Sequence, residues 1–360
     1  SASRVGAYTA NFGSSTISLT STSDSLLPTA NGTTAYALNL QTSSVTVYGN
    51  VKFLNSSSTI TLTPGTSTVT YAAVATGKTI TSNAQSFYNI TFNGSGGGWA
   101  PQDALIATND LTMTAGTLSG TQNVTVNGAG AGTAGIINLT GGTFTQSVVA
   151  AKNFGTISGS TAWTFYNLTF TATGTYTITT QTGGTGDITI TNVLNISNST
   201  TTFNGGNRTF HLTGSGTPFT KTGTFTAGTS TVSYENTTSA TITGGCSGTG
   251  YYYNIQTSPA SGTPTYTLKT TGTSFLAGTL VMTPSGVKPI ESLREGDIVL
   301  SYDIATRSVV TSPVIGTVNG AATNYYIING KIKTTSNHIF IMSDYSQKSV
   351  EELKIGDSLA

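Results

Sequence analysis

Charged residues are scarce in this chain of 360 residues. Asp, Glu, Lys and Arg make up 8% of it, against about a quarter in ordinary soluble domains, so its solubility must come from Thr, Ser, Asn and Gly. This balance is typical of extracellular structural β proteins. The formal net charge is +1, and no stripe of Lys and Arg with interleaved aromatic residues occurs. Nothing can therefore neutralise a phosphate backbone, and we exclude nucleic acid as the main partner.

Residues that bind metals or form disulfides are also few. Cys246 is the only cysteine, and His211 and His338 are the only histidines, so neither a disulfide framework nor a Cys/His metal site can form within one chain. Cys246, in the turn sequence TGGCSG, is interpreted as a small structural residue. Calcium-binding repeats need recurrent aspartates, and those upstream of Lys269 are scattered: Asp24, Asp103, Asp110 and Asp187. We expect no metal and no cofactor.

Membrane-spanning segments and nucleotide-binding loops are missing from the sequence as well. No run of about twenty apolar residues occurs, which predicts no membrane span. The N-terminus has no charged segment followed by an apolar one, so Ser1 is interpreted as the start of a mature chain whose targeting peptide was removed or precedes it. The Gly-rich runs at 94–98 and 128–135 lack the Lys-Thr pair of a phosphate-binding loop and are expected to be turns.

The charged residues that do occur are unevenly distributed. Twelve lie in residues 1–270 and fifteen in residues 271–360. We therefore place a domain boundary near Lys269 to Thr273, which separates a Thr/Ser/Gly-rich repeat region at 1–270 from a second domain at 271–360.

Three phrases recur at intervals of about eighty residues upstream of this boundary, and each follows a related segment by roughly twenty residues. The phrases are FYNITF at 87–92, FYNLTF at 165–170 and YYNIQT at 252–257. The related segments are TSTVTY at 66–71, TFTQSV at 143–148 and TSTVSY at 229–234. Such self-similarity indicates three diverged copies of one unit.

Short segments of this region alternate apolar residues with Thr or Ser, as at Ile60 and Leu62, Val124 and Val126, and Ile188 and Ile190. Period two with β-branched residues predicts half-buried strands. Four Asn-Gly pairs are expected to supply glycines with positive φ for the turns between strands, at Asn31, Asn93, Asn127 and Asn204. The predicted fold class is all-β.

Two architectures satisfy this pattern in residues 1–270. A repeat β-solenoid stacks short strands so that each turn covers the apolar face of the previous one, whereas tandem β-sandwiches would make each unit of about eighty residues a separate domain. We favour the solenoid because the strands are short and poor in the large inward residues that a sandwich core needs.

Aromatic pairs recur at the same place in each unit, at Phe87-Tyr88, Phe165-Tyr166 and Tyr251-Tyr252. A carbohydrate-binding platform is one interpretation. A position that is shared by all three units favours packing in the core or between turns.

Residues 50–268 resemble the Thr/Ser/Gly-rich repeats of bacterial and archaeal surface adhesins, in which phrases such as GTFTAGTSTV and FYNLTF are common. The resemblance implies a secreted or cell-surface structural protein: an adhesin stalk, a surface-layer component or the subunit of an extracellular filament. Its expected partners are other copies of the chain and a carbohydrate or another cell-surface ligand. The N-terminal stretch VGAYTANFGSSTISLTS is interpreted as an extended segment that could add a strand to a neighbour's open edge. A phage or virus tail-fibre protein is a further alternative.

Eleven Asn-x-Ser/Thr sequons occur, all before residue 273: Asn31, Asn55, Asn89, Asn93, Asn123, Asn138, Asn167, Asn195, Asn198, Asn207 and Asn236. In a secreted glycoprotein they would be acceptor sites. A composition so rich in Ser and Thr also produces sequons by chance.

The C-terminal segment carries motifs of a different kind. It begins SFLAGTLVMTPSGVKPIESLREGDIVLSYD at Ser274 and continues with TTSNHIFIM and KSVEELKIGDSLA. This text closely resembles the opening part of Hedgehog/intein (Hint) domains, with a FLAGT strand directly after the nucleophile position, a block ending in G-D-x-V-L-S-Y-D, and a T-x-x-H block from Thr335 to His338. The resemblance implies a partial Hint-like β domain at 271–360.

The resemblance also implies acyl-shift chemistry at the Thr273–Ser274 bond. Ser274 would be the nucleophile, where the family usually has Cys, and its hydroxyl would attack the Thr273 carbonyl in an N-to-O shift. His338 would protonate the departing amide nitrogen, and Thr335 would help to hold the strained bond and the developing oxyanion. The family's later catalytic block and terminal His-Asn do not occur in the sequence. We therefore expect a structural or spent module, with self-cleavage that releases the repeat region as the alternative.

Overall fold

The computed structural model describes residues 8–26, 29–30, 35–55, 60–157, 161–184, 186–243, 252–269, 275–303, 308–314, 317, 325–335, 338–344 and 346–359. The fold is all-β, as predicted: strands make up 56% of the chain, and the described ranges contain no α-helix. No helix in the part described is long and apolar enough to cross a membrane. The chain forms two compact units. Unit 1 comprises residues 1–242 and 252–267, and unit 2 comprises residues 243–251 and 268–360.

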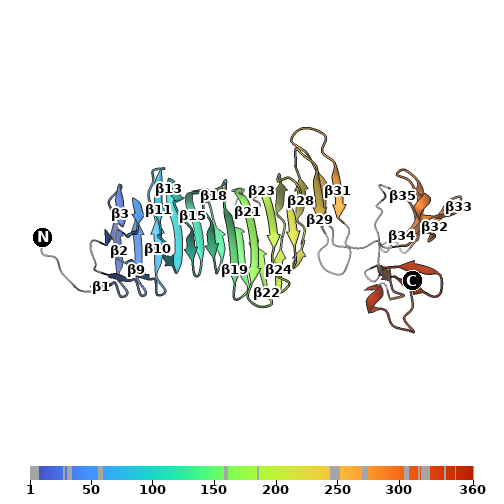
Figure 1. The fold of residues 1–360 in the computed structure, drawn as a ribbon, viewed down its shortest axis with the longest axis horizontal. Coiled ribbons are helices and arrows are strands. Elements are labelled where there is room, and N and C mark those ends of the chain that lie inside the picture. The colour runs from blue at the N-terminus through green and yellow to red at the C-terminus, as the bar shows by residue number, and fades with distance from the viewer. Residues whose placement is uncertain are drawn as a thin grey trace. The chain divides into compact units, whose positions relative to one another are not determined.

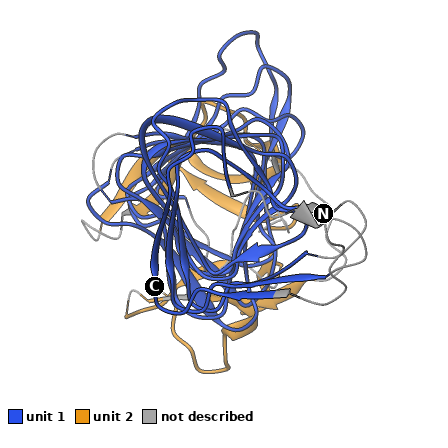
Figure 2. Ribbon diagram, turned by 90° about the vertical axis from the view of Figure 1, so that its left-hand side faces the viewer, with its two compact units in different colours: residues 1–242, 252–267 blue, residues 243–251, 268–360 orange. Residues whose placement is uncertain are grey.

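Unit 1 is a parallel β-solenoid of about 10 turns, which confirms the predicted architecture (Figure 1). Its turns follow one another around a common axis (Figure 2), and its strands fall on three faces, A, B and C. Four long strands bend at a corner and contribute to two faces each: β13 (Asn89–Pro101), β15 (Leu111–Gly120), β21 (Trp163–Ala172) and β23 (Ile188–Ile196).

Face A contains the first parts of β13 and β15 together with β2 (Thr16–Leu19), β6 (Ser44–Val47), β10 (Thr68–Tyr71), β17 (Gly130–Gly132), β20 (Lys152–Thr156), β22 (Tyr176–Thr180), β24 (Thr201–Asn204) and β27 (Thr224–Thr226). Face B contains the last parts of β13 and β15 and the first parts of β21 and β23, together with β3 (Asp24–Leu26), β7 (Asn50–Lys52), β11 (Lys78–Thr81), β18 (Ile136–Leu139), β25 (Thr209–Leu212), β28 (Thr231–Tyr234) and β30 (Asn254–Thr257). Face C contains the last parts of β21 and β23, together with β12 (Ser86–Phe87), β14 (Leu105–Ala107), β16 (Val124–Val126), β19 (Thr143–Val148) and β26 (Phe219–Lys221).

Smaller groups of strands complete unit 1. At the N-terminal end β1 (Tyr8–Asn11), β5 (Tyr36–Asn39) and β9 (Ile60–Thr63) form a parallel sheet, and β4 (Thr29–Ala30) pairs with β8 (Leu54–Asn55). Near the C-terminal end of the solenoid β29 (Ala240–Thr243) pairs with β31 (Tyr266–Lys269).

Strands of successive turns on the three faces pair in parallel. The offset between partners differs along the solenoid. It is short where Leu111 pairs with Gly130 and much longer where Val51 pairs with Ile80. The alternative of tandem β-sandwiches is wrong, because sandwiches are built from antiparallel strands.

The core of unit 1 is one continuous cluster of apolar side chains inside the solenoid. The residues predicted to face inward all belong to it: Ile60, Leu62, Val124, Val126, Ile188 and Ile190. Aromatic rings stack from turn to turn, as at Phe170 and Phe203, whose ring centroids lie 3.9 Å apart. Each turn therefore covers the apolar residues of its neighbours, which no single turn can do alone.

Each recurring phrase of the sequence contains a strand that pairs with the related segment on the preceding turn. One Thr–Asn pair marks each copy: Thr68–Asn89, Thr143–Asn167 and Thr231–Asn254. In each pair the Asn Nδ2 donates to the Thr Oγ1, at 3.3, 3.4 and 3.4 Å. The three pairs lie on faces A, C and B respectively. The spacing of the copies is thus not a whole number of turns, and the structural repeat is the turn itself.

The role predicted for the Asn-Gly pairs is wrong at three of the four sites. These glycines do not have positive φ: Gly94, Gly128 and Gly205. They lie instead where neighbouring turns approach closely. A Cβ at Gly94 would overlap the Ala73 carbonyl oxygen and lie 2.7 Å from the Trp99 ring. The fourth pair, at Asn31, lies outside the described residues.

Arg208 is charged, yet it lies inside the solenoid with 1% of its surface exposed. Its guanidinium donates to the carbonyl oxygens of Thr156, of Gln181 at 3.1 Å and of Gly186 at 3.2 Å. Burial lowers the pKa of Arg208, and the nearby Asp187 carboxylate opposes this effect. These acceptors belong to the two preceding turns. The Arg208 side chain therefore connects three turns where the chain passes from face A to face B.

Unit 2 is built from antiparallel hairpins and two short 3-10 turns. The hairpins are β32 (Leu280–Thr283) with β33 (Gly286–Pro289), β34 (Ile298–Asp303) with β35 (Ser308–Pro313), β36 (Tyr326–Ile328) with β37 (Ile332–Thr334), and β38 (Ile339–Ile341) with β39 (Gln347–Ser349). The 3-10 turns are η1 (Ile290–Ser292) and η2 (Val350–Glu352). In the described ranges its buried apolar side chains are Leu293, Met342 and Val350.

Replacing Gly94 with Ala tests the close approach between turns. We expect Gly94→Ala to lower the free energy of unfolding by about 1–3 kcal/mol, because the added methyl group must displace backbone of the preceding turn or the Trp99 ring. Denaturant unfolding followed by circular dichroism measures the loss. Gly98→Ala is the matched control, since its Cβ would meet Thr76 at ordinary contact distances of 3.4–3.5 Å. Equal losses in the two variants would contradict the explanation.

Candidate functional sites

The residues predicted from the T-x-x-H block lie together in unit 2. Thr335 directly follows β37 and is 5% exposed, and His338 directly precedes β38. The His338 amide donates to the Thr335 carbonyl oxygen at 3.2 Å, and the Val350 amide donates to the His338 carbonyl oxygen at 2.9 Å. The backbone of the block is therefore fixed on both sides of the His338 ring.

Phe275 brings the start of the FLAGT segment to the same place. It forms an isolated antiparallel bridge with Thr334, and the amide of Leu276 donates to the Lys333 carbonyl oxygen at 3.0 Å. The centroids of the Phe275 and His338 rings are 4.1 Å apart. Thr273 and Ser274 lie outside the described residues. The structure thus brings together Thr335, His338 and the residue that follows Ser274.

The surroundings of His338 are apolar. The Phe340 ring lies edge-on to the imidazole at 4.9 Å between centroids, and the Phe275 ring is tilted against it. Burial among these rings lowers the pKa of His338, because the charged imidazolium loses hydration that the rings do not replace. His338 is therefore neutral at pH 7 and gains its proton under acidic conditions.

The sequon asparagines differ in exposure. The exposed ones are Asn93, Asn123, Asn138 and Asn207, and the partly buried ones are Asn89, Asn167, Asn195 and Asn198. Asn236 is 0% exposed, and its Nδ2 donates to the Gly214 carbonyl oxygen. Asn31 and the side chain of Asn55 lie outside the described residues.

The partly buried sequon amides form hydrogen bonds between turns. Asn167 Oδ1 accepts from Asn192 Nδ2 at 2.8 Å, and Asn195 Oδ1 accepts from Thr220 Oγ1 at 3.0 Å. Asn198 Nδ2 donates to the Ala172 carbonyl oxygen at 2.8 Å. An Asn-x-Thr sequence also places its polar residues outward and its central residue inward on a strand. These sequons have a structural role that does not depend on a glycan.

One cluster of titratable side chains lies on face B near the C-terminal end of the solenoid. His211 Nδ1 lies 2.6 Å from Glu235 Oε1, and His211 Nε2 lies 3.3 Å from Asp187 Oδ2. Ser233 Oγ donates to the same Glu235 oxygen at 2.7 Å. Burial alone would lower the pKa of His211, but the hydrogen bonds and charges of Glu235 and Asp187 outweigh it and raise the pKa.

This cluster is not evident from the sequence alone. On face B His211 pairs with Thr189 of the preceding turn and with Ser233 of the following turn. Asp187 lies two positions before Thr189 and Glu235 two positions after Ser233, so each carboxylate is a diagonal neighbour of the imidazole on the outward side. Asp187 and Glu235 lie equally far from His211 in the sequence. This equal spacing could have indicated the cluster only if the number of residues per solenoid turn had been known.

The other sequence-predicted features are distributed differently. Phe87 and Phe165 are 0% exposed and belong to the core, whereas Tyr166 is exposed. The Tyr252 ring packs edge-on against Phe219 at 6.2 Å. Tyr251 and Cys246 lie outside the described residues. Within the ranges described, no three His, Cys, Asp or Glu side chains converge on a point where they could hold a metal ion.

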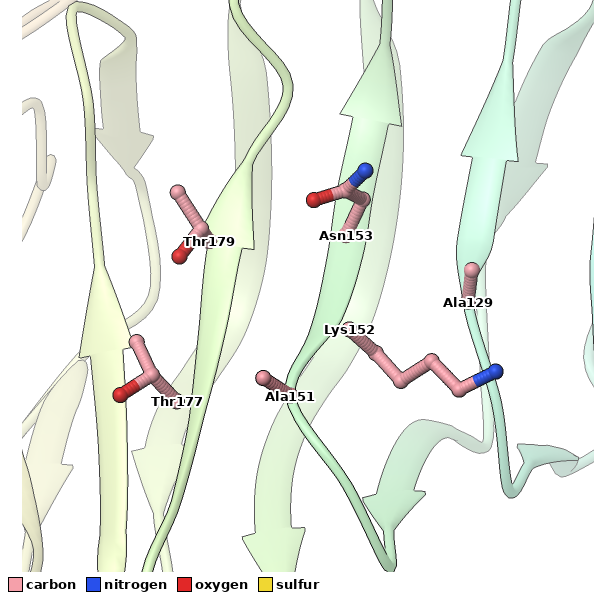
Figure 3. A pocket seen from close by; sticks show the side chains of 6 residues that line it. All are labelled: Ala129, Ala151, Lys152, Asn153, Thr177 and Thr179. Atoms are coloured by element: carbon pink, nitrogen blue, oxygen red, sulfur yellow. The ribbon is translucent and has the colours of Figure 1, made fainter.

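A shallow pocket of about 210 Å³ lies on face A (Figure 3). Its lining is Ala129, Ala151, Lys152, Asn153, Thr177 and Thr179. The two alanines leave the hollow between longer side chains of the neighbouring turns. Lys152 at its edge forms an ion pair with Asp110 at 3.2 Å, so its charge is already compensated.

Comparison of the chain with protein-family models, with curated proteins and with solved structures found no match.

The exposure of the sequons predicts which of them accept a glycan. When the chain is produced in a host that glycosylates sequons, we expect glycans at the exposed sites Asn93, Asn123, Asn138 and Asn207, and none at Asn236, whose amide is buried and hydrogen-bonded. Peptide mass spectrometry after enzymatic deglycosylation in heavy-oxygen water identifies occupied sites. A glycan at Asn236 in folded protein would contradict the structure.

The His211 cluster predicts that acid stabilises the end of the solenoid. A folded-state pKa raised above the unfolded value gives a contribution that is complete below about pH 6.5 and is lost as the pH rises through the folded pKa. We expect a loss on the order of 1 kcal/mol, or about 2–4 °C in the melting temperature, between pH 5.5 and pH 8.5. Glu235→Gln should reduce this part of the pH dependence, because only Asp187 would then raise the pKa of His211, and His338→Gln should leave it. An unchanged pH profile in Glu235→Gln would exclude the cluster as its cause.

Proposed function

We propose that the chain is an extracellular structural protein of a surface, acting as an adhesin stalk or as the subunit of a filament. The observation that carries the proposal is the continuous core of unit 1, which runs through successive turns of a solenoid whose outward side chains are mainly Thr, Ser and Asn. Each turn adds about 4.8 Å along the axis. Such a rod is held together along its whole length by one core and remains soluble without many charges.

The rod is stabilised against separation of its turns. Backbone pairing joins neighbouring turns on three faces, and side-chain bonds such as Asn39 to Asn11 and Asn109 to Asn89, both at 2.8 Å, add to it. These contacts favour a mechanical role, in which the rod separates a ligand-binding part from the surface or joins neighbouring subunits of a filament. A carbohydrate or another cell-surface ligand remains the proposed partner of a stalk, and a tail-fibre protein would use the same rod.

Protease treatment of intact source cells tests this proposal. We expect peptides from residues 60–243 to be released from the cell surface or found in the medium, because a surface rod is accessible from outside. Mass spectrometry of the released peptides measures this, with a cytosolic enzyme as the control for lysis. Recovery of the chain only after lysis would contradict the proposal.

A second candidate function is self-cleavage at the Thr273–Ser274 bond, supported by the contact of Phe275 with His338. In this reaction the Ser274 Oγ forms a bond to the Thr273 carbonyl carbon, the C–N bond breaks, and the Ser274 hydroxyl proton goes to solvent. The protonated His338 would give its proton to the departing nitrogen, and Thr335 would help to hold the strained bond and the developing oxyanion. Water then hydrolyses the ester, leaving a carboxylate on Thr273 and restoring the Ser274 hydroxyl.

This candidate predicts a pH dependence. Because burial lowers the pKa of His338, its acid form is scarce at pH 7, and we expect cleavage to be about tenfold faster at pH 5.5 than at pH 7.5 if protonation of the nitrogen limits the rate. Intact-mass spectrometry over time measures it. Ser274→Ala and His338→Gln should each abolish cleavage, and Ser292→Ala should not. A single mass at every pH would leave unit 2 as a structural module.

A further inference from the structure

Among the described residues, the last turn of the solenoid has no following strand on face B, whereas the strands of the two earlier copies each have one. The strand with the phrase YYNIQT, β30, pairs with β28 before it, and no strand of the described residues pairs with it on the other side. All four of its residues are exposed. We call this strand the exit edge.

The two earlier copies of the phrase show what normally covers such a strand. Ile90 pairs onward with Leu111, and Leu168 pairs onward with Leu194. Both Ile90 and Leu168 are 0% exposed, whereas Ile255, in the same place of the third copy, is 45% exposed. Ile255 therefore has the position of a core residue, but no described turn follows that would bury it.

The polar ladder ends at the same place. In the earlier copies the phrase Asn accepts a hydrogen bond from an Asn of the following turn, with Asn109 donating to Asn89 and Asn192 donating to Asn167, both at 2.8 Å. No donor among the described residues reaches the corresponding oxygen of Asn254. Both the apolar and the polar column thus stop one turn short.

The first turn of the solenoid has the complementary deficiency. β2 pairs with β6 after it, and nothing described pairs with its other side; we call β2 the entry edge. Ile17 and Leu19 face inward but are only partly buried, while their partners Val45 and Val47 are 1% and 0% exposed. A turn placed before β2 would bury them.

We propose that the exit edge of one copy receives the entry edge of a second copy, so that copies associate head to tail by continuing the solenoid. The proposal rests on the proposed structural function and specifies how a filament would form. A second copy is the occupant because one chain carries both edges, and because head-to-tail stacking keeps the parallel pairing used on every face. Joining two exit edges would set the strands antiparallel. Because each added copy continues the solenoid along its axis, these head-to-tail contacts cannot close into a ring and produce open filaments.

The N-terminal stretch thereby has a different role from the one expected from the sequence. Residues Tyr8–Asn11 and Thr16–Leu19 pair with β5 and β6 of their own chain. They form the first turn of the solenoid and offer its outer edge, instead of leaving as a free donor strand.

Charged substitutions at the two edges test the proposal. We expect the unmodified chain to associate in a concentration-dependent series in sedimentation velocity, with filaments in electron micrographs. Ile255→Lys or Ile17→Lys alone should weaken association by at least about tenfold, because each places a charge where a neighbouring turn must pack. Val74→Lys is the control, since Val74 is 73% exposed and belongs to neither edge.

Mixing the two edge variants separates head-to-tail from symmetric association. Ile17→Lys keeps its exit edge and Ile255→Lys keeps its entry edge, so the mixture should form a heterodimer that cannot grow, which also shows that both variants are folded. Dimers of Ile17→Lys alone would indicate that two exit edges meet and would overturn the proposal. The proposal would also be overturned if the unmodified chain stayed monomeric and Ile255→Lys made unit 2 sensitive to protease. That result would show that the chain covers its own exit edge. Surface exposure on source cells is measured independently, so a monomeric surface protein would leave the proposed function standing as a stalk.

Discussion

Parallel pairing of each turn with the turn before it is the constraint on which unit 1 depends. No turn can bury its apolar residues alone, so the inward side chains of neighbouring turns must fill the interior together. In the column from Tyr71 through Phe92 and Met113 to Gly132, the Tyr71 and Phe92 rings stack at 5.0 Å. Gly132 has no side chain where the Trp163 ring passes. Large and small residues compensate along the axis, so each substitution affects the turns on both sides.

The fold class of unit 1 could be predicted because it depends on the alternation of apolar and polar residues within each short segment of sequence. Alternation at Ile188 and Ile190 requires only that every second residue faces the core. The partners of each strand could not be predicted, because the offset between paired residues changes along the solenoid and the extra residues of the longer turns lie in corners without a common pattern. The repeated phrases mark three of these pairings. The role of the glycines could not be predicted for the same reason: Gly94 is required by the close approach of the neighbouring turn, which its local sequence does not indicate.

The candidate sites also differ in whether their residues are close together or far apart in the sequence. Thr335 and His338 could be chosen from the sequence because both belong to one short block, T-x-x-H, that resembles a block of Hint domains. The position of Phe275 beside them depends on its pairing with Thr334. The spacing of residues in the sequence does not indicate this pairing. Asp187 and Glu235 lie far from His211 in the sequence and acquire a common role only when the length of the local turn is known.

The scarcity of charge, which is typical of extracellular structural β proteins, also follows from the solenoid itself. Outward residues of successive turns lie above one another at about 4.8 Å, so a charge repeated in one column would face its own sign at close range. Thr, Ser and Asn avoid this cost because each both donates and accepts, as Asn89 does between Thr68 and Asn109. The ion pairs of unit 1 obey the same rule. Lys52 with Asp24, for example, sets opposite charges on neighbouring turns at 2.9 Å.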